Sequence, residues 1–134
     1  MKQKDKNGQK RILIIEDEQY LRELYQEILE DEGFIIETAS DGMDGYVKMA
    51  KGGYDLILLD VMLPRMDGLE LLAKLRKGPK PKKTNGPIVL LTNLSKDMAI
   101  SKGKTLGISG YLIKSDLTPG EIIEKVKGYL KIKI

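Results

Sequence analysis

The feature of this sequence that most constrains its fold is the regular alternation of short apolar runs with segments of helical periodicity. Five runs have the length of a β-strand and are dominated by Ile, Leu and Val. They cover residues 11–15, 34–39, 56–59, 87–92 and 110–114. Most of them are continuously apolar rather than alternating, which is typical of strands buried on both faces. They predict a parallel sheet covered by helices on both sides.

Helical periodicity occupies the intervals between these runs. Apolar residues from Leu21 to Leu29 recur at spacings of three and four, which predicts an amphipathic helix that ends at Gly33. The last helix is predicted to begin at Thr118, because Thr118 and Glu121 have the spacing of a capping box. Three further helices are predicted over residues 41–50, 69–77 and 95–106.

Five strands alternating with five helices predict a single α/β domain over residues 11–131. We expect a flavodoxin-like (βα)5 fold, in which a five-stranded parallel sheet of order 2-1-3-4-5 forms the middle of a three-layer sandwich. In this topology ligands bind at the carboxyl ends of the strands, beside strands one and three. Residues 1–10 precede the first strand, are rich in lysine, and are predicted to form a disordered basic tail.

Composition excludes several kinds of site. The 134 residues contain no cysteine and no histidine, which excludes disulfides, thiolate metal sites and a histidine general base. No apolar run approaches the roughly 20 residues of a membrane span, and the polar start is unlike a secretory signal. We therefore expect a cytoplasmic protein with no membrane association. Basic residues concentrate in the tail and in residues 76–86; we interpret both as solvated segments and expect no direct contact with nucleic acid.

Polar residues with functional chemistry follow or end four of the five predicted strands. Glu16 and Asp17 follow the first strand and Asp60 follows the third, while Thr92 ends the fourth and Lys114 ends the fifth. Because the carboxyl ends of parallel strands meet at one edge, these side chains should converge there. Each residue alone has a simpler explanation: an acid after a strand often caps a helix, a threonine often shapes a turn, and a lysine often lies on the surface.

The predicted cluster fits magnesium-dependent phosphoryl transfer. Neighbouring carboxylates repel one another, and an oxygen-only site of this kind suits Mg²⁺, with Mn²⁺ as an alternative. Lys114 supplies a second positive charge, and the Thr92 hydroxyl can donate to an anionic oxygen. Asp60 is then placed as a nucleophile that attacks phosphorus and forms an aspartyl phosphate. Because this carboxylate is already ionised, the reaction needs no general base.

Four segments of the sequence occur in the order and approximate spacing of a known family: "ILIIEDE", "DLILLDVMLPRMDG", "LLTN" and "GYLIK". By these motifs the sequence resembles the receiver domain of two-component response regulators, from about Arg11 to Leu130. The resemblance implies a phosphorelay protein that takes a phosphoryl group from a histidine kinase or a histidine phosphotransfer protein. It also implies a protein that catalyses its own phosphorylation and slow dephosphorylation rather than a conventional turnover enzyme.

The resemblance further implies a metal-binding role for the acidic residues. Asp60 would be the phosphoacceptor and a metal ligand. Asp17 would bind Mg²⁺ directly and Glu16 would bind it through a water molecule. The backbone carbonyl of Met62 would complete the protein ligands.

The remaining functional residues would act on the phosphoryl group and on the output surface. By resemblance, Thr92 and Lys114 would contact the phosphoryl oxygens, and Tyr111 would change rotamer together with Thr92 on activation. The face formed by helix 95–106, strand 110–114 and the last helix would meet a downstream protein. Because the predicted domain fills the 134 residues, we expect output by protein contact, or a chain that is part of a larger regulator.

The sequence departs from the family pattern at three places. Ser115 follows Lys114 where the family usually has a proline, so the turn there is predicted to be strained or differently built. Asn93 stands where the family favours a very small residue, and is expected to narrow access to the site. Met62 and Leu94 are apolar and offer no side-chain group to orient an attacking water, which predicts slow self-dephosphorylation.

Three other functions fit the same fold. A phosphorylation-silent interaction module is compatible with the atypical Asn93 and Ser115. A magnesium-dependent aspartyl phosphohydrolase of the haloacid dehalogenase type needs a second aspartate two residues after the first, where this sequence has Met62. Flavin binding needs a hydroxyl- and glycine-rich loop after the first strand, whereas "EDEQYLRE" is acidic and would repel a phosphate.

Overall fold

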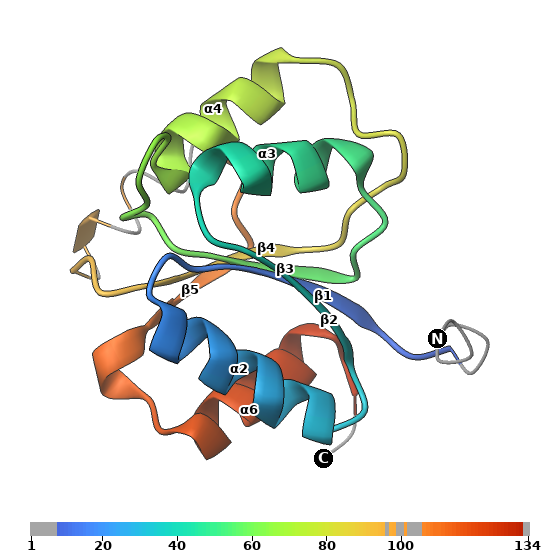
Figure 1. Ribbon diagram of the computed structural model, residues 1–134, viewed down its shortest axis with the longest axis vertical. Helices are drawn as coiled ribbons and strands as arrows, with labels where there is room; N and C mark the ends of the chain where they lie inside the picture. Colours follow the sequence, from blue (N-terminus) through green and yellow to red (C-terminus); the bar gives the residue numbers. More distant parts are fainter. Residues whose placement is uncertain (1–7, 96, 99–100, 102–105, 133–134) are drawn as a thin grey trace.

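The computed structural model describes residues 8–95, 97–98, 101 and 106–132 (Figure 1). Its centre is one parallel sheet of five strands in the order β2-β1-β3-β4-β5. This is the topology that the sequence predicts. The strands are β1 (Arg11–Ile15), β2 (Ile35–Ala39), β3 (Leu56–Leu59), β4 (Ile88–Thr92) and β5 (Gly110–Ile113).

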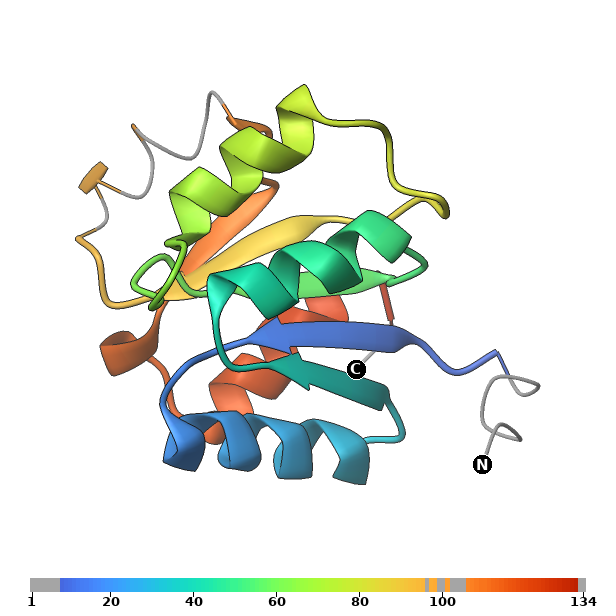
Figure 2. The ribbon, with the colours of Figure 1, turned by 45° about the horizontal axis from the view of Figure 1, so that its top comes forward.

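Helices cover both faces of the sheet, as Figures 1 and 2 show. One layer contains α2 (Gln19–Asp31) and α6 (Pro119–Tyr129), and the other contains α3 (Gly42–Lys51) and α4 (Gly68–Lys77). The helix predicted over residues 95–106 lies largely outside the described residues. None of the described helices is long and apolar enough to cross a lipid bilayer.

The core consists of two apolar clusters, one on each side of the sheet. Ile12 and Ile14 of β1 belong to the cluster beneath α2 and α6, whereas Leu13 and Ile15 belong to the cluster beneath α3 and α4. All four side chains are at most 1% exposed. Successive residues of a strand point to opposite faces, so a strand covered on both sides must be apolar at every position. This explains the continuous apolar runs in the sequence.

Helix caps fix where the chain leaves and re-enters the sheet. Asp41 caps α3 by accepting a hydrogen bond from the Asp44 amide, 2.8 Å away. The predicted capping box of the last helix is present: Thr118 Oγ1 accepts from the Glu121 amide, and Glu121 accepts from the Thr118 amide. Gly33, with φ of 94°, directly follows the C-terminal cap of α2.

The fifth strand is one residue shorter than predicted. Its ladder with β4 ends at the pair Thr92 and Ile113. Lys114 instead begins a short 3-10 turn, η2 (Lys114–Asp116). The prediction extended the strand to Lys114 because no typical turn-forming residue occurs from Tyr111 to Lys114. The described residues contain no cis peptide bond, so the turn after Lys114 is built differently from one with a cis proline.

Candidate functional site

Three carboxylates meet at the carboxyl ends of β1 and β3. Glu16 and Asp17 follow β1, and Asp60 follows β3. The parallel ladder sets Ile15 opposite Leu59, and the Asp60 amide donates to the Ile15 carbonyl at 3.0 Å. One oxygen from each of the three carboxylates lies within 4.8 Å of the other two. The strand register therefore brings together the acids that the sequence predicts to converge.

Lys114 reaches this cluster from the carboxyl end of β5, the strand at one edge of the sheet. Its Nζ lies 2.6 Å from Asp60 Oδ2 and 2.5 Å from Glu16 Oε1. Only 10% of the Lys114 side chain is exposed. The lysine thus crosses the rim from β5 to contact residues that follow β1 and β3, rather than extending into solvent as many surface lysines do.

Burial and charge together set the protonation of this cluster. Burial raises the pKa of the Glu16 carboxyl, although the adjacent Lys114 ammonium and a hydrogen bond from the Glu18 amide oppose the rise. Burial alone would lower the pKa of Lys114, but its bonds to Asp60 and Glu16 outweigh burial and raise it. The ammonium therefore stays protonated near neutral pH and holds the two buried acids together.

The donor set fits a hard divalent cation. With all groups ionised, the carboxylates of Glu16, Asp17 and Asp60 carry three negative charges, and Lys114 neutralises one of them. The two remaining charges match those of Mg²⁺, which prefers oxygen ligands. Glu16 Oε1 is buried and touches the Lys114 ammonium, yet it has no hydrogen bond of acceptable geometry. Such an oxygen can accept a hydrogen bond from a water molecule bound to a cation.

Asp17 is left available because α2 does not use it as a cap. The N-terminal cap of α2 is Glu18, which makes no side-chain capping bond. Arg22 instead fixes the preceding turn: its Nη1 donates to the backbone carbonyls of Glu16 at 3.0 Å and Asp17 at 3.1 Å. Asp17 is exposed at the edge of the cluster. Sequence reasoning missed Arg22, although its place one helical turn after the acidic pair was a usable signal.

The loop after β3 is shaped around Asp60. The Met62 amide donates to Asp60 Oδ1 at 3.2 Å, while 63% of Met62 is exposed at the mouth of the site. A Cβ on Gly68 would come within 2.4 Å of the Asp60 carbonyl oxygen. Only glycine permits the start of α4 to approach the backbone of Asp60 so closely. This accounts for the glycine that ends the motif "DLILLDVMLPRMDG".

Thr92 and Tyr111 lie on the two strands beyond Asp60. Thr92, at the end of β4, is fully buried, and its hydroxyl accepts a hydrogen bond from the Leu94 amide at 3.3 Å. Tyr111 pairs with Leu90 across the β4–β5 ladder and is half-buried against the cluster beneath α3 and α4. Thr92 therefore lies at the end of β4, the strand next to β3, which Asp60 follows. The coupled rearrangement of Thr92 and Tyr111 stays a prediction.

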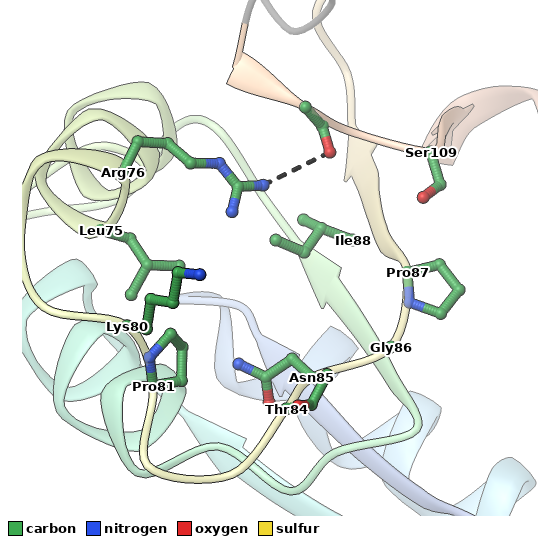
Figure 3. A pocket seen from close by; sticks show the side chains of 11 residues that line it. Leu75, Arg76, Lys80, Pro81, Thr84, Asn85, Gly86, Pro87, Ile88 and Ser109 are labelled. Atoms are coloured by element: carbon green, nitrogen blue, oxygen red, sulfur yellow. Dashed lines mark hydrogen bonds between the residues drawn. The ribbon is translucent and has the colours of Figure 1, made fainter.

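A pocket separate from the acidic cluster lies at the opposite end of the sheet. It has a volume of about 480 Å³ and lies beside the start of β4 (Figure 3). Arg76, on one wall, donates from Nε to the Leu106 carbonyl at 2.9 Å and so ties α4 to the segment before β5. The pocket shares no residue with the acidic cluster. Its lining residues include Leu75, Arg76, Lys80, Thr84, Asn85 and Ser109.

The fold and the acidic cluster together are typical of one class of protein, and comparison with known sequences identifies that class. Residues 12–127 match the response regulator receiver domain family. The match covers most of the chain, so the chain belongs to the family of response regulator receiver domains. The resemblance read from the sequence motifs is thereby confirmed.

Individual relatives bear out this assignment. The chain is 38% identical over 120 residues to the transcriptional regulatory protein SrrA of Staphylococcus aureus (strain NCTC 8325 / PS 47), which covers 90% of this chain and 47% of SrrA. It is 32% identical over 127 residues to the transcriptional regulatory protein ResD of Bacillus subtilis (strain 168), covering 95% of this chain and 50% of ResD. The chain thus spans about half the length of these curated relatives.

Solved structures give the same result for the fold. The chemotaxis response regulator CheY4 of Vibrio cholerae matches with a TM-score of 0.77 and 29% sequence identity. That match covers 90% of this chain and 98% of CheY4. The flavodoxin-like arrangement of the sheet and helices is therefore shared with a known receiver over nearly all of its length.

Proposed function

We propose that this receiver domain is a phosphorylation switch in which Asp60 accepts a phosphoryl group from a phosphohistidine donor. The observation that carries the proposal is the joining of Glu16 and Asp60 by Lys114, with the carboxylate of Asp17 within 4.8 Å of both acids. A merely structural cluster of three acids around one lysine would be left with excess negative charge. In a cluster that takes part in phosphoryl transfer, the excess negative charge binds a dication, and the dication in turn neutralises the phosphoryl oxygens.

The metal in this proposal is Mg²⁺, with Mn²⁺ as an alternative. The carboxylates of Glu16, Asp17 and Asp60 and the backbone carbonyl of Met62 would hold it, with Glu16 acting through water. When bound, the ion supplies positive charge that stabilises the equatorial oxygens of the transferring phosphoryl group. The buried position of Asp60, which is 4% exposed, makes that charge more effective than it would be in water.

The chain's own residues supply the rest of the chemistry. A carboxylate oxygen of Asp60 forms a bond to phosphorus while the bond from phosphorus to the donor's imidazole nitrogen breaks, and the electron pair leaves with the imidazole. Lys114 neutralises charge on the phosphoryl oxygens. The Thr92 hydroxyl donates to one of these oxygens, and Tyr111 shifts with it, so that the phosphorylated form favours a second conformation.

The partners follow from this role. The donor is a histidine kinase or a histidine phosphotransfer protein, and a downstream protein reads the face that includes β5 and α6. The helix predicted at residues 95–106, which would complete that face, lies largely outside the described residues. We also propose slow self-dephosphorylation, because the exposed Met62 side chain offers no group to orient an attacking water.

Phosphorylation by a small donor tests the proposal. The protein is incubated with acetyl phosphate and Mg²⁺, and its intact mass is measured. Wild type should gain one phosphoryl group and Asp60→Asn should gain none. Asp31→Asn is the matched control, because Asp31 is exposed at the distal end of α2, and it should behave as wild type.

Two outcomes would contradict the proposal. Incorporation that persists in Asp60→Asn would remove Asp60 from the reaction. A wild-type protein that stays unmodified in Mg²⁺, while a known receiver is phosphorylated in the same reaction, would favour the phosphorylation-silent module.

A further inference from the structure

Two residues that depart from the family pattern are in direct contact. Asn93 directly follows Thr92, and Ser115 directly follows Lys114. Asn93 Oδ1 accepts a hydrogen bond from the Ser115 backbone amide at 2.9 Å. The two residues are 22 positions apart, so their contact is not visible in the sequence. Each occupies the position next to a residue of the candidate site.

This bond continues the connection between β4 and β5 beyond the end of their ladder. The last ladder pair is Thr92 and Ile113. Lys114 therefore lies between two backbone anchors: Ile113 paired in the sheet, and Ser115 bonded to Asn93. Past Ser115 the turn is weakly held, since the Leu117 amide donates to the Lys114 carbonyl at 3.4 Å. The Asn93 bond is thus the stronger restraint on the carboxyl side of Lys114.

The contacts of Lys114 require its side chain to be placed accurately. Its ammonium must reach Asp60 at 2.6 Å and Glu16 at 2.5 Å from a turn on another strand. A rotation of the backbone at the Lys114–Ser115 peptide would move the ammonium away from both acids, because the long side chain magnifies a small change at its base. The Asn93 bond opposes that rotation by fixing the direction of the Ser115 amide.

We propose that Asn93 is a positioning residue, whose side-chain carbonyl holds the Ser115 amide and thereby fixes Lys114 against Asp60. The inference rests on the proposed function for its effect on phosphorylation, but its effect on Lys114 stands by itself. The hydrogen bond needs both residues, the acceptor of Asn93 and the backbone amide of Ser115. A proline at position 115 has no amide hydrogen to donate, and a small residue at position 93 has no acceptor to offer.

Matched substitutions separate this role from the size of Asn93. Asn93→Leu keeps most of the volume and removes the acceptor, whereas Asn93→Ala removes both. Ser115→Pro removes the donor and also disfavours the helical backbone conformation of Lys114, so it supports the Asn93 variants rather than replacing them. Ser115→Ala keeps the backbone amide and is the control. Both residues are exposed, so these substitutions leave the buried core intact.

The first readout is the position of Lys114 without any phosphoryl chemistry. The protein is labelled with a small amine-reactive reagent, and the labelling rates of individual lysines are followed by peptide mass spectrometry. Asn93→Leu, Asn93→Ala and Ser115→Pro should each accelerate labelling of Lys114 several-fold, because its ammonium spends more time away from the acids. Ser115→Ala should label as wild type, and Lys125, exposed on α6, should react equally in all variants.

The second readout is binding of fluoroberyllate, a mimic of the phosphoryl group, measured by ¹⁹F NMR in saturating Mg²⁺. Asn93→Leu and Ser115→Pro should each weaken binding by about 5- to 10-fold, the effect expected for one ordinary hydrogen bond. The double variant should be no weaker than the weaker single variant, because both remove the same bond. Affinity for Mg²⁺ alone and the melting temperature should change little, which a merely structural role would not predict.

The two proposals fail in distinguishable ways. Unchanged Lys114 labelling in Asn93→Leu and Ser115→Pro, or an equal change in Ser115→Ala, would overturn the positioning role of Asn93 whatever the phosphorylation result. Tighter fluoroberyllate binding in Asn93→Ala with none of the predicted loss of affinity in Asn93→Leu would also overturn it, because the size of residue 93 would then be the only effect. Faster Lys114 labelling in a protein whose wild type binds no fluoroberyllate would support the positioning role and reject the proposed function.

Discussion

At the scale of single residues, the site depends on one ammonium group. Lys114 compensates two carboxylates that are almost fully buried, Glu16 at 2% exposed and Asp60 at 4%. An ionised carboxylate buried without a partner is costly, and the cost falls either on stability or on the pKa of the group. The raised pKa of Glu16, caused chiefly by burial, shows that the compensation is incomplete.

Replacing Lys114 with methionine should separate its two roles. The local charge becomes one unit more negative, so we expect Mg²⁺ to bind several-fold more tightly at low ionic strength. Without Mg²⁺ the variant should be less stable by about 3–5 kcal/mol, since two buried acids lose their cation. Phosphoryl incorporation should slow, because the second positive charge is gone.

Calorimetric Mg²⁺ titration and urea unfolding measure these effects, with Lys125→Met as a surface control. Unchanged Mg²⁺ affinity and unchanged stability in Lys114→Met would show that the lysine does not share the electrostatics of the acids.

At the scale of elements, polar contacts also tie neighbouring strands together away from the site. Arg11 of β1 pairs with Glu37 of β2 at 2.5 Å, and the Tyr54 hydroxyl, just before β3, donates to Glu37 at 2.8 Å. The Arg11 guanidinium also lies over the Tyr54 ring, 4.9 Å from its centroid. Burial tends to raise the pKa of Glu37, but the bonds from Tyr54 and Arg11 outweigh burial and lower it.

This cluster predicts a pH dependence of stability with a definite sign. Because the pKa of Glu37 is lower in the folded than in the unfolded chain, its stabilisation is complete above its ordinary pKa of 4.5 and is lost as pH falls through the folded value. Since 41% of the Glu37 side chain is exposed, screening limits the effect to below about 1 kcal/mol.

Unfolding of wild type and Glu37→Gln should be compared between about pH 7 and pH 3. The stability difference between them should be largest near neutral pH and should shrink in acid. A difference that stays constant, or grows as pH falls, would contradict a lowered pKa for Glu37.

Sequence reasoning reached the elements and the composition of the site but not the contacts across the rim. The strands were predictable because burial on both faces leaves continuous apolar runs, and the start of α6 because Thr118 and Glu121 form a local capping pattern. Parallel topology then places all strand ends at one edge. The contact of Lys114 with Glu16, and the bond from Ser115 to Asn93, depend on side-chain directions that residue spacing along the chain does not encode.

At the scale of the whole molecule, the two ends of the sheet differ in character. The carboxyl ends of the strands carry the acidic cluster, and the other end carries the pocket lined by Arg76 and Lys80. Because the acidic cluster joins residues that follow β1 and β3, a cation bound there links these two strands, to which Lys114 already ties the end of β5. Any ligand that binds the folded but not the unfolded chain stabilises the whole domain.

Mg²⁺ should therefore raise the melting temperature. At a concentration about a hundredfold above its Kd, the gain should be near 3 kcal/mol, or several degrees. Mn²⁺ should act similarly, whereas sodium chloride at equal ionic strength should not. Asp17→Asn should lose most of the gain, because Asp17 is the exposed acid of the three and is not needed for packing.

Thermal unfolding, monitored by circular dichroism in Mg²⁺ and in EDTA, measures this change in melting temperature. Equal stabilisation of wild type and Asp17→Asn would place the cation elsewhere on the chain.

The most direct test of the central claim is to locate the phosphoryl group chemically. The wild-type protein is treated with a small phosphodonor in Mg²⁺, reduced with borohydride, and digested for peptide sequencing by mass spectrometry. Reduction of an acyl phosphate converts its aspartate into homoserine. The account predicts homoserine at position 60 alone, and only when Mg²⁺ is present. Homoserine at Asp17, or a mark at position 60 that forms equally well in EDTA, would contradict it.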